Sequence, residues 1–148
     1  MRKDIQTKKG LLPATFDSYQ IVQDGIIVFR FTDLQNDHKS LRVGLAKEEG
    51  IISPAYVCVK CENVVPEFLY LQLHTFDLRK DFYSMGDGMR QTLSYSDIKD
   101  MPVYIPSIDE QVRIVSLFRS FDKKISLQEL EVEKLKQIKS ACLDKMIA

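Results

Sequence analysis

Ser107-Ile108-Asp109-Glu110-Gln111 is the stretch of sequence that decides the fold, because it opens a segment without glycine or proline as far as Ala148. Ser107 and Glu110 have the spacing of a capping box, in which each side chain bonds a backbone N–H at the start of a helix. The sequence therefore predicts one helix from Ser107 to about Met146. At about 1.5 Å per residue this helix would extend for roughly 58 Å, much further than a single small domain requires.

Large apolar side chains recur along this predicted helix at intervals of three and four residues, which places them on one face. The face comprises Ile114, Phe118, Phe121, Ile125, Val132 and Leu135, and it continues on a slightly drifted line through Ile138, Cys142 and Met146. One interpretation is a helix, or two helices joined near Ser126, folded back onto its own domain. The other is a projecting helix that buries this face on another chain. Burying about seven to nine such side chains would contribute on the order of 10 to 20 kcal/mol before entropy is subtracted. Residues 1–106 could hardly cover the whole length, so we favour packing between chains.

The preceding residues, 1–106, alternate β-rich runs with turns and a helix, which is typical of an α+β domain. We expect a small mixed sheet with packed helices, followed by a long coiled-coil-type helix over 107–148. Two β-rich runs flank Asp24-Gly25, a signal for a hairpin or a tight turn. Another β-rich segment spans 51–59. Residues 101–106 are bounded by prolines, which predicts a strand at the edge of the sheet.

A helix is predicted to start at Pro66, since proline is favoured at the first helical position. Gly86-Asp87-Gly88 is expected to end this helix. Its apolar residues are Phe68, Leu69, Leu71, Leu73, Phe76 and Phe82.

Composition excludes several classes of protein. The chain has 148 residues, 45% of them hydrophobic and 28% charged, which is ordinary for a single globular domain. No apolar run approaches the roughly 18 to 20 residues of a membrane span, and residues 1–9 lack the apolar core of a secretory signal. The three cysteines, Cys58, Cys61 and Cys142, cannot all pair with one another, which fits a reducing compartment. The sequence therefore predicts a cytoplasmic protein.

The charge balance gives no broad basic surface. Lys and Arg number 21, and so do Asp and Glu; the counts are 13 and 14 in residues 1–106, and 8 and 7 in residues 107–148. Tight nonspecific binding to nucleic acid requires a basic surface. Any DNA-binding role must therefore come from a local cluster, or from partners that supply the phosphate contacts.

No motif predicts catalysis. Cys58-Val59-Lys60-Cys61 has the C-x-x-C spacing but no second ligand pair, and residues three apart on a strand point to opposite faces. The two histidines, His38 and His74, have no nucleophile beside them in the sequence. We predict a non-catalytic chain with no metal and no cofactor.

Two polar loops carry side chains of the kinds that bond base edges and phosphates. A solvated loop has the same composition, and that alternative stays open on the residues alone. The candidate DNA contacts are Arg30, Thr32, Gln35, Asn36, Lys39 and Arg42 in the first loop, and Arg90 and Gln91 in the second.

The order of four features resembles the target-recognition domain of the specificity subunit of type I restriction-modification systems. These features are Gly50-Ile51-Ile52-Ser53-Pro54-Ala55-Tyr56, the proline-initiated helix with Phe68-Leu69, Gly88-x-Arg90-Gln91-x-Leu93, and Ile105-Pro106-x-x-x-Glu110-Gln111-x-x-Ile114. The stretch over 30–37 also looks like one found in a branch of that family. The resemblance covers about 19–148.

The resemblance implies a non-enzymatic subunit that reads half of a bipartite target in double-stranded DNA. It also implies that the long helix pairs antiparallel with another, sets the spacing between half-sites and docks methyltransferase subunits. Expected partners are therefore DNA, methyltransferase subunits, and a second copy or a second specificity fragment. The helix residues assigned to partner contact are Glu110, Gln111, Ile114, Phe118, Phe121, Ile125, Val132, Leu135, Ile138 and Cys142.

The sequence departs from the family pattern in its extent. A full specificity subunit carries two recognition domains and two helical regions, whereas 148 residues have room for one of each. A recognition domain is also usually longer before its Pro-x-x-x-Glu-Gln segment. Two hypotheses follow: a half-subunit that homodimerises, or a truncated assembly or decoy protein that binds partner subunits without reading DNA.

Overall fold

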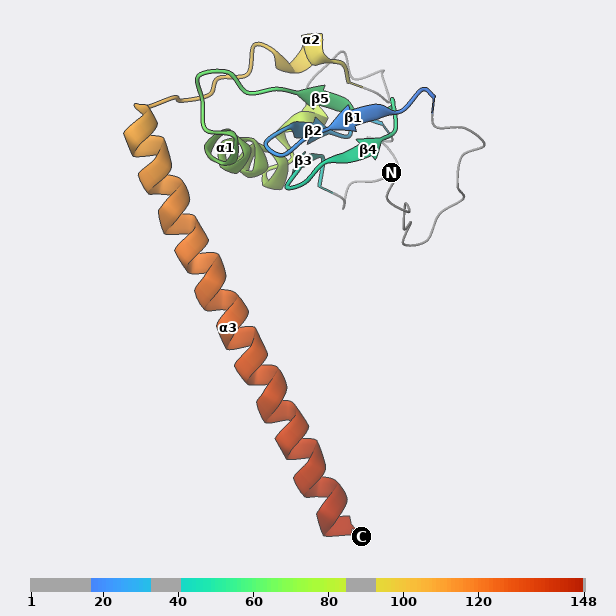
Figure 1. Cartoon of the computed structure of the whole chain (residues 1–148), viewed down its shortest axis with the longest axis vertical. Helices are drawn as coiled ribbons and strands as arrows, with labels where there is room; N and C mark the ends of the chain where they lie inside the picture. Colours follow the sequence, from blue (N-terminus) through green and yellow to red (C-terminus); the bar gives the residue numbers. More distant parts are fainter. Residues whose placement is uncertain (1–16, 33–40, 85–92, 148) are drawn as a thin grey trace.

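The computed structural model describes residues 17–32, 41–84 and 93–147, and it confirms the expected α+β fold (Figure 1). Within these residues, short strands and helices form a globular part, from which one long helix projects. In chain order the elements are β1 (Gln20–Val22), β2 (Ile27–Phe29), β3 (Val43–Leu45), β4 (Gly50–Ile52), β5 (Val57–Val59), α1 (Pro66–Leu78), the 3-10 helix η1 (Asp81–Ser84), α2 (Tyr95–Ile98) and α3 (Ile108–Ile147).

Strand β2 is the centre of a three-stranded antiparallel sheet, between β3 and β5. The expected mixed sheet is corrected, because every strand pair among the described residues is antiparallel. Its side chains alternate, because Ile27 and Phe29 are buried on one face and Val28 between them is only half-buried. Phe31 continues the buried face; its ring stacks on Phe29 with centroids 5.1 Å apart, and the Phe82 ring meets both edge-on. Helix α1 packs against β3, so the core lies between this sheet and α1.

The Asp24-Gly25 signal marks a tight turn rather than a hairpin. The Ile26 N–H donates to the Gln23 carbonyl oxygen (3.2 Å), and Gly25 has φ +84°, a conformation that favours glycine. The flanking strands do not pair with each other, since β1 pairs with β4 in a separate two-stranded sheet. The hairpin alternative is wrong because the Gly25 N–H donates to the Ala46 carbonyl (3.0 Å), which directs the chain toward β3 instead.

Helix α1 starts at Pro66, as predicted, but ends before Phe82. Lys80 has φ +65°, which breaks the helix, and its N–H donates to the Asp77 carbonyl oxygen (3.0 Å). Phe82 is still fully buried, but it reaches the core from η1. The terminator predicted at 86–88 lies outside the described residues.

The segment 101–106 forms no strand, contrary to the prediction. Pro102 and Pro106 have no N–H to donate to a sheet, and a side chain of α1 binds the backbone between them. The Tyr104 N–H donates to Gln72 Oε1 (3.0 Å), and Gln72 Nε2 donates to the Tyr104 carbonyl oxygen (2.5 Å). This pair of bonds replaces a sheet partner and leads the chain to the start of α3.

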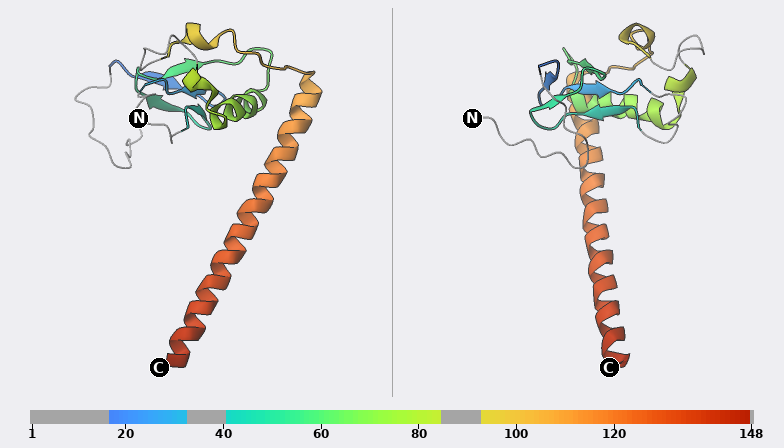
Figure 2. Two further views of the ribbon diagram at one scale, coloured as in Figure 1. Left: turned by 180° about the vertical axis from the view of Figure 1, so that it is seen from behind. Right: turned by 90° about the vertical axis from the view of Figure 1, so that its right-hand side faces the viewer.

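Helix α3 is one continuous element of 40 residues that projects away from the globular part (Figures 1 and 2). The Glu110 N–H donates to Ser107 Oγ (3.4 Å), the hydroxyl half of the predicted capping box. The folded-back interpretation, with a break near Ser126, is therefore wrong. Among the described residues, no helix is both long enough and apolar enough to cross a membrane.

Candidate partner helix and nucleic-acid interface

Gln111 fixes the start of α3 to the globular part. Its side chain is completely buried; Oε1 accepts a hydrogen bond from the Val65 N–H, and Nε2 donates to the Pro106 carbonyl oxygen, both at 2.8 Å. Val115, one turn further along, is also buried. We call this attachment of α3, at Gln111 and Val115, the joint. Gln111 was predicted to contact a partner chain, and this is corrected, because its side-chain amide already bonds the backbone of Val65 and Pro106 within the chain.

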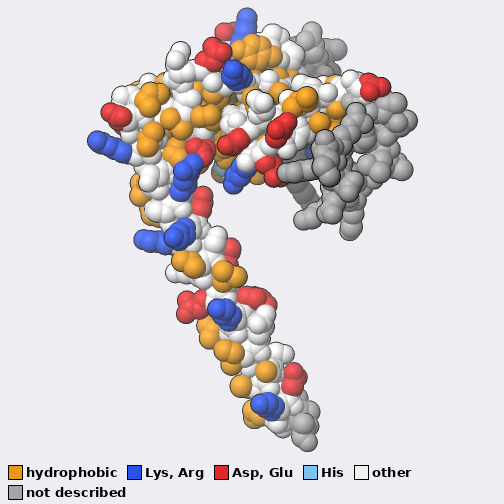
Figure 3. Space-filling view, in the orientation of Figure 1, with side chains coloured by type: hydrophobic (Ala, Val, Ile, Leu, Met, Phe, Trp, Pro, Cys, Tyr) orange, Lys and Arg blue, Asp and Glu red, His pale blue; other side chains and the backbone are white. Residues whose placement is uncertain are grey.

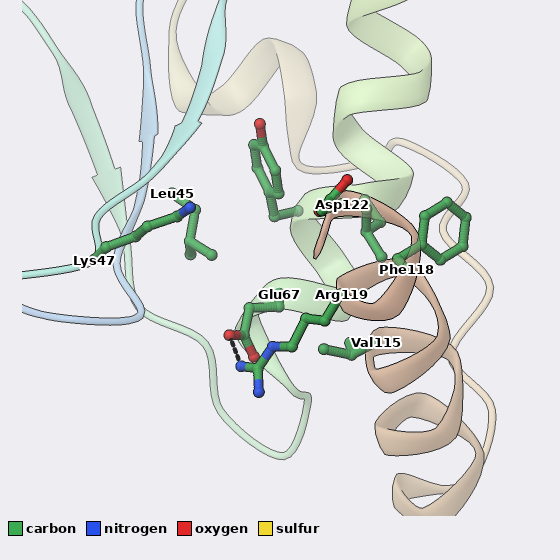
Figure 4. Close-up of a pocket in the computed structure, with 9 residues that line it drawn as sticks. Leu45, Lys47, Glu67, Val115, Phe118, Arg119 and Asp122 are labelled. Carbon is green, nitrogen blue, oxygen red and sulfur yellow. Dashed lines mark hydrogen bonds and ion pairs between the residues drawn. The ribbon is translucent and has the colours of Figure 1, made fainter. Parts of the chain in front are cut away.

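A shallow pocket lies where α3 leaves the globular part (Figure 4). Arg119 of α3 forms an ion pair with Glu67 in the first turn of α1 across this pocket. The lining side chains are Leu45, Lys47, Glu67, Tyr70, Leu71, Val115, Phe118, Arg119 and Asp122. Burial raises the pKa of the Tyr70 hydroxyl, and the charges of Asp77 and Asp122 raise it further. This end of α3 is therefore held at several points over its first three turns.

Beyond these turns, the apolar face of α3 is uncovered within the described chain. Every described side chain from Ser116 to Met146 is exposed, and Figure 3 shows apolar side chains along the rod-like helix. Ile114, at the joint, is half-buried, and Glu110 is exposed. Along the predicted face, the exposed fraction is 45% at Phe118, 60% at Ile138 and 82% at Met146, and Phe121, Ile125, Val132 and Leu135 lie between the first two values. Cys142 is also exposed. The predicted face is thus present as a surface that residues 17–32, 41–84 and 93–147 leave uncovered.

The sequence did not single out the further exposed apolar residues on α3. They are Ile108, Val112, Leu117, Leu127, Leu130 and Leu143. Leu117 and Leu143 lie within about 40° of the direction of Phe121 at 100° per residue, so they widen the predicted face. Leu130 lies nine residues from Phe121, or two and a half turns, and therefore on the opposite side.

Of the predicted DNA contacts, the structure describes Arg30, Thr32 and Arg42, and it brings them together at one end of the β2–β3 pair. The Arg30 N–H donates to the Arg42 carbonyl oxygen, and Arg42 Nη1 donates to the Thr32 carbonyl oxygen, both at 2.8 Å. Arg30 and Thr32 are half-buried. The other predicted contacts lie outside the described residues: Gln35, Asn36, Lys39, Arg90 and Gln91.

Arg42 is corrected from a DNA contact to a structural residue. Only 1% of its surface is exposed, and Nε donates to the Tyr83 hydroxyl (3.0 Å) in addition to the bond from Nη1. Its guanidinium carbon also lies 5.4 Å from the centre of the Tyr83 ring. Asp77, fully buried on α1, accepts through Oδ2 from the N–H groups of Arg42 (2.5 Å) and Val43 (3.0 Å). Sequence reasoning missed Asp77 and Tyr83, because no local pattern marks partners 35 to 41 residues away.

Of the C-x-x-C cysteines, Cys58 is the middle residue of β5 and Cys61 lies two residues after the strand; both are half-buried and free. Burial raises the pKa of the Cys58 and Cys61 thiols. In the part of the chain that the structure describes, no group of three or more His, Cys, Asp and Glu side chains could hold a metal ion.

These features define a class of protein. It is an α+β domain with polar residues at one end of the β2–β3 pair and a long helix whose apolar face is uncovered within the described residues. The family model described as the Type I restriction modification DNA specificity domain matches residues 42–139, about two thirds of the chain. The chain therefore belongs to this family, a DNA-recognition module that is not itself catalytic, and acts as a specificity component of a type I restriction-modification system. A search of curated proteins gives no match. The matched range runs from β3 through the joint and along most of α3, so both parts belong to the family pattern.

Proposed function

We propose that this chain is the subunit that reads one half of a bipartite DNA target, while α3 docks methyltransferase subunits and a second copy of the chain. The observation that carries the proposal is the apolar face of α3, exposed along about eight turns beyond the joint. Exposed apolar surface of this extent is uncommon on a protein that acts alone and marks a site of interaction with other proteins.

The joint supports a role in spacing. Gln111 binds backbone on both sides of it, and Arg119, about two turns further along α3, pairs with Glu67. Because both attachments lie on the first three turns, α3 leaves the globular part in a defined direction. If two copies pair antiparallel along α3, the globular parts that contact DNA are held a fixed distance apart.

The end of the sheet supports a role in reading DNA. Arg30 and Thr32 lie where β2 ends and retain exposed surface, and the remaining proposed contacts belong to the two segments that start and end nearby: Gln35, Asn36, Lys39, Arg90 and Gln91. We place the reading surface here, in the part assigned to residues 1–106. Because the formal net charge is zero, we propose that methyltransferase subunits supply most of the phosphate contacts.

A gel-shift titration tests this proposal. The probe is a pool of DNA duplexes with a randomised central region, titrated with the chain alone and with the methyltransferase subunit of the same system. Enrichment of a sequence motif that requires both proteins supports the proposal. Formation of a complex with the methyltransferase subunit that enriches no motif contradicts DNA reading and favours the assembly or decoy role.

Arg30→Ala sharpens the assignment of the reading surface. We expect about tenfold weaker capture of the enriched duplex, because a good arginine contact to a base contributes about 1–3 kcal/mol. Assembly with the methyltransferase subunit, followed by size-exclusion chromatography, should not change. Equal capture by Arg30→Ala and the natural chain would remove this side chain from the surface.

A further inference from the structure

The pocket at the joint adjoins the apolar face of α3. Its apolar lining includes Leu71 of α1 and Val115 of α3, and charged side chains of both helices surround it (Figure 4). Phe118 belongs both to the pocket lining and to the apolar face, and 45% of its surface is exposed. A helix that packs along this face therefore also reaches the pocket.

The apolar face repeats every seven residues, as in a coiled coil. One position of the repeat holds Phe118, Ile125, Val132, Lys139 and Met146, and the other holds Ile114, Phe121, Gln128, Leu135 and Cys142. In an antiparallel pair of such helices, each residue of the first set packs opposite a residue of the second set on the partner helix. Residue numbers rise along one helix and fall along the other, so the possible registers differ by steps of seven residues.

One of these registers places apolar residues of a second copy at the pocket. Phe118 then lies opposite Cys142 of the second copy, within the apolar face. On the side of α3 that lines the pocket, Val115 then lies opposite Leu143 of the second copy, because each of them follows a residue of the face by one position. Leu143 is 47% exposed within the described chain. The apolar lining of the pocket is thus matched by an exposed apolar side chain near the far end of α3.

The charged residues favour the same register over its neighbours. Asp122, on the pocket side of α3, lies opposite Lys136 of the second copy, and this pair occurs twice in a symmetric dimer. A shift of seven residues places Asp122 opposite Glu129 or opposite Leu143 of the second copy, according to its direction. The favoured register also brings the two Glu129 side chains together at the symmetry axis, so on this side of the helices it gains two ion pairs against one repulsion.

We propose that the pocket at the joint binds the far end of α3 from a second copy of the chain. Leu143 of the second copy covers Val115 and Phe118, and Lys136 of the second copy pairs with Asp122. Because the dimer is symmetric, the same contacts form at both joints. This inference rests on the proposed function, in which α3 pairs antiparallel with a second copy, and it adds the register of that pairing.

Disulfide trapping tests the register in the full chain. Phe118→Cys places a thiol opposite Cys142 of the second copy, and oxidation with copper phenanthroline links thiols that lie close together. Two cysteine Cα atoms must lie within about 7 Å of each other, whereas a shift of seven residues moves a side chain by roughly 10 Å along the helix. Ile125→Cys is the matched control, since it lies on the same face one repeat further along. Mass spectrometry of the linked peptides distinguishes these products from any that involve Cys58 or Cys61.

We expect at least about tenfold more of the 118–142 link in Phe118→Cys than of the 125–142 link in Ile125→Cys, because only the first pair is within reach of a disulfide. A dominant 125–142 link would overturn the proposal, since it means a register shifted by seven residues. A Cys142–Cys142 link in the natural chain would also overturn it, since it means parallel helices. A natural chain that stays monomeric by light scattering contradicts the proposed self-association itself, whereas a dimer without the 118–142 link contradicts only this inference.

Charge reversal gives a second test that needs no new cysteine. Asp122→Lys or Lys136→Asp alone brings like charges together twice in each dimer, and we expect roughly five- to tenfold weaker self-association by sedimentation equilibrium. The two changes combined restore opposite charges and should return the dissociation constant to within about twofold of the natural value. Lys123→Asp, exposed but directed away from the paired face, is the matched control for a reversed charge. A combined variant that associates more weakly than either single variant would overturn the proposal.

Discussion

The globular part and the rod-like helix α3 use apolar side chains in opposite ways. On β2, Ile27 and Phe29 alternate with outward residues and are at most 2% exposed, because α1 and η1 cover them. On α3, Phe121 and Leu135 recur at helical spacing but are 46% and 58% exposed. The apolar side chains of the globular part are therefore covered within the described chain, whereas those of α3 are exposed. Substitutions in the globular part should therefore lower stability, whereas substitutions on the apolar face of α3 should disturb assembly, and the two effects can be measured separately.

The largest expected effect is on assembly. Phe121→Asp, or Leu135→Asp, should abolish self-association of the chain, because it places an unpaired carboxylate in the face that the proposed dimer buries, and each dimer contains the change twice. Multi-angle light scattering over a concentration series measures the mass. Leu130→Asp is the matched control, since it adds the same charge on the opposite side of the helix. An unchanged mass in both Phe121→Asp and Leu135→Asp would contradict packing between chains.

The next effect is on stability. Phe82→Ala should lower the free energy of unfolding by about 3–5 kcal/mol, because the ring is fully buried against Phe29 and Phe31 and its loss leaves a cavity. Urea unfolding followed by circular dichroism measures this. The same truncation at Leu130, which is 60% exposed, should change stability by less than about 0.5 kcal/mol. Similar losses at both positions would mean that α3 belongs to the same cooperative unit.

A smaller effect is expected at the joint that connects the two parts. Gln111→Ala leaves the Val65 N–H and the Pro106 carbonyl without their partner, which should cost about 1–3 kcal/mol. Arg119→Ala should cost at most about 1 kcal/mol, since its ion pair with Glu67 is exposed. Distances between spin labels on α1 and at Ser140 should broaden in Gln111→Ala and change little in Arg119→Ala. The reverse order would move the main attachment from Gln111 to Arg119.

The smallest effect concerns cysteine reactivity. Cys58 and Cys61 should react with iodoacetamide at pH 8 more slowly than the exposed Cys142, because burial raises the pKa of both thiols and so lowers their thiolate fraction. Mass spectrometry of timed samples resolves the three sites. The Cys142 rate should also fall as self-association increases, whereas the other two rates should not. Labelling of Cys58 as fast as Cys142 would argue against a covered strand β5.

Local signals explain what the sequence predicts well. Ser107 with Glu110, and Pro66 at a first helical position, define helix starts through neighbouring backbone groups, so the long helix and the start of α1 are both predictable. The apolar face of α3 follows from side-chain spacing, and its exposure follows from a helix that is too long for residues 1–106 to cover. The Asp24-Gly25 turn is predicted as well, but a turn does not determine which strands pair across it.

Long-range contacts explain what the sequence does not predict. An arginine in a polar stretch resembles a DNA contact, and only Asp77 and Tyr83, far away in the chain, convert Arg42 into a buried residue. Gln111 is similar, because its position on α3 is compatible with a partner face until Val65 and Pro106 close around it. The two corrected residues are both polar groups whose partners are backbone atoms or side chains that no sequence spacing reveals.

The joint also makes α3 a lever. About 36 residues extend past Gln111, which is a lever arm of roughly 54 Å. A tilt of only ~10° at Gln111 would displace the far tip by ~9 Å, or nearly three base-pair steps along a duplex at about 3.4 Å each. One buried glutamine amide therefore governs a distance that is measured at the opposite end of the molecule.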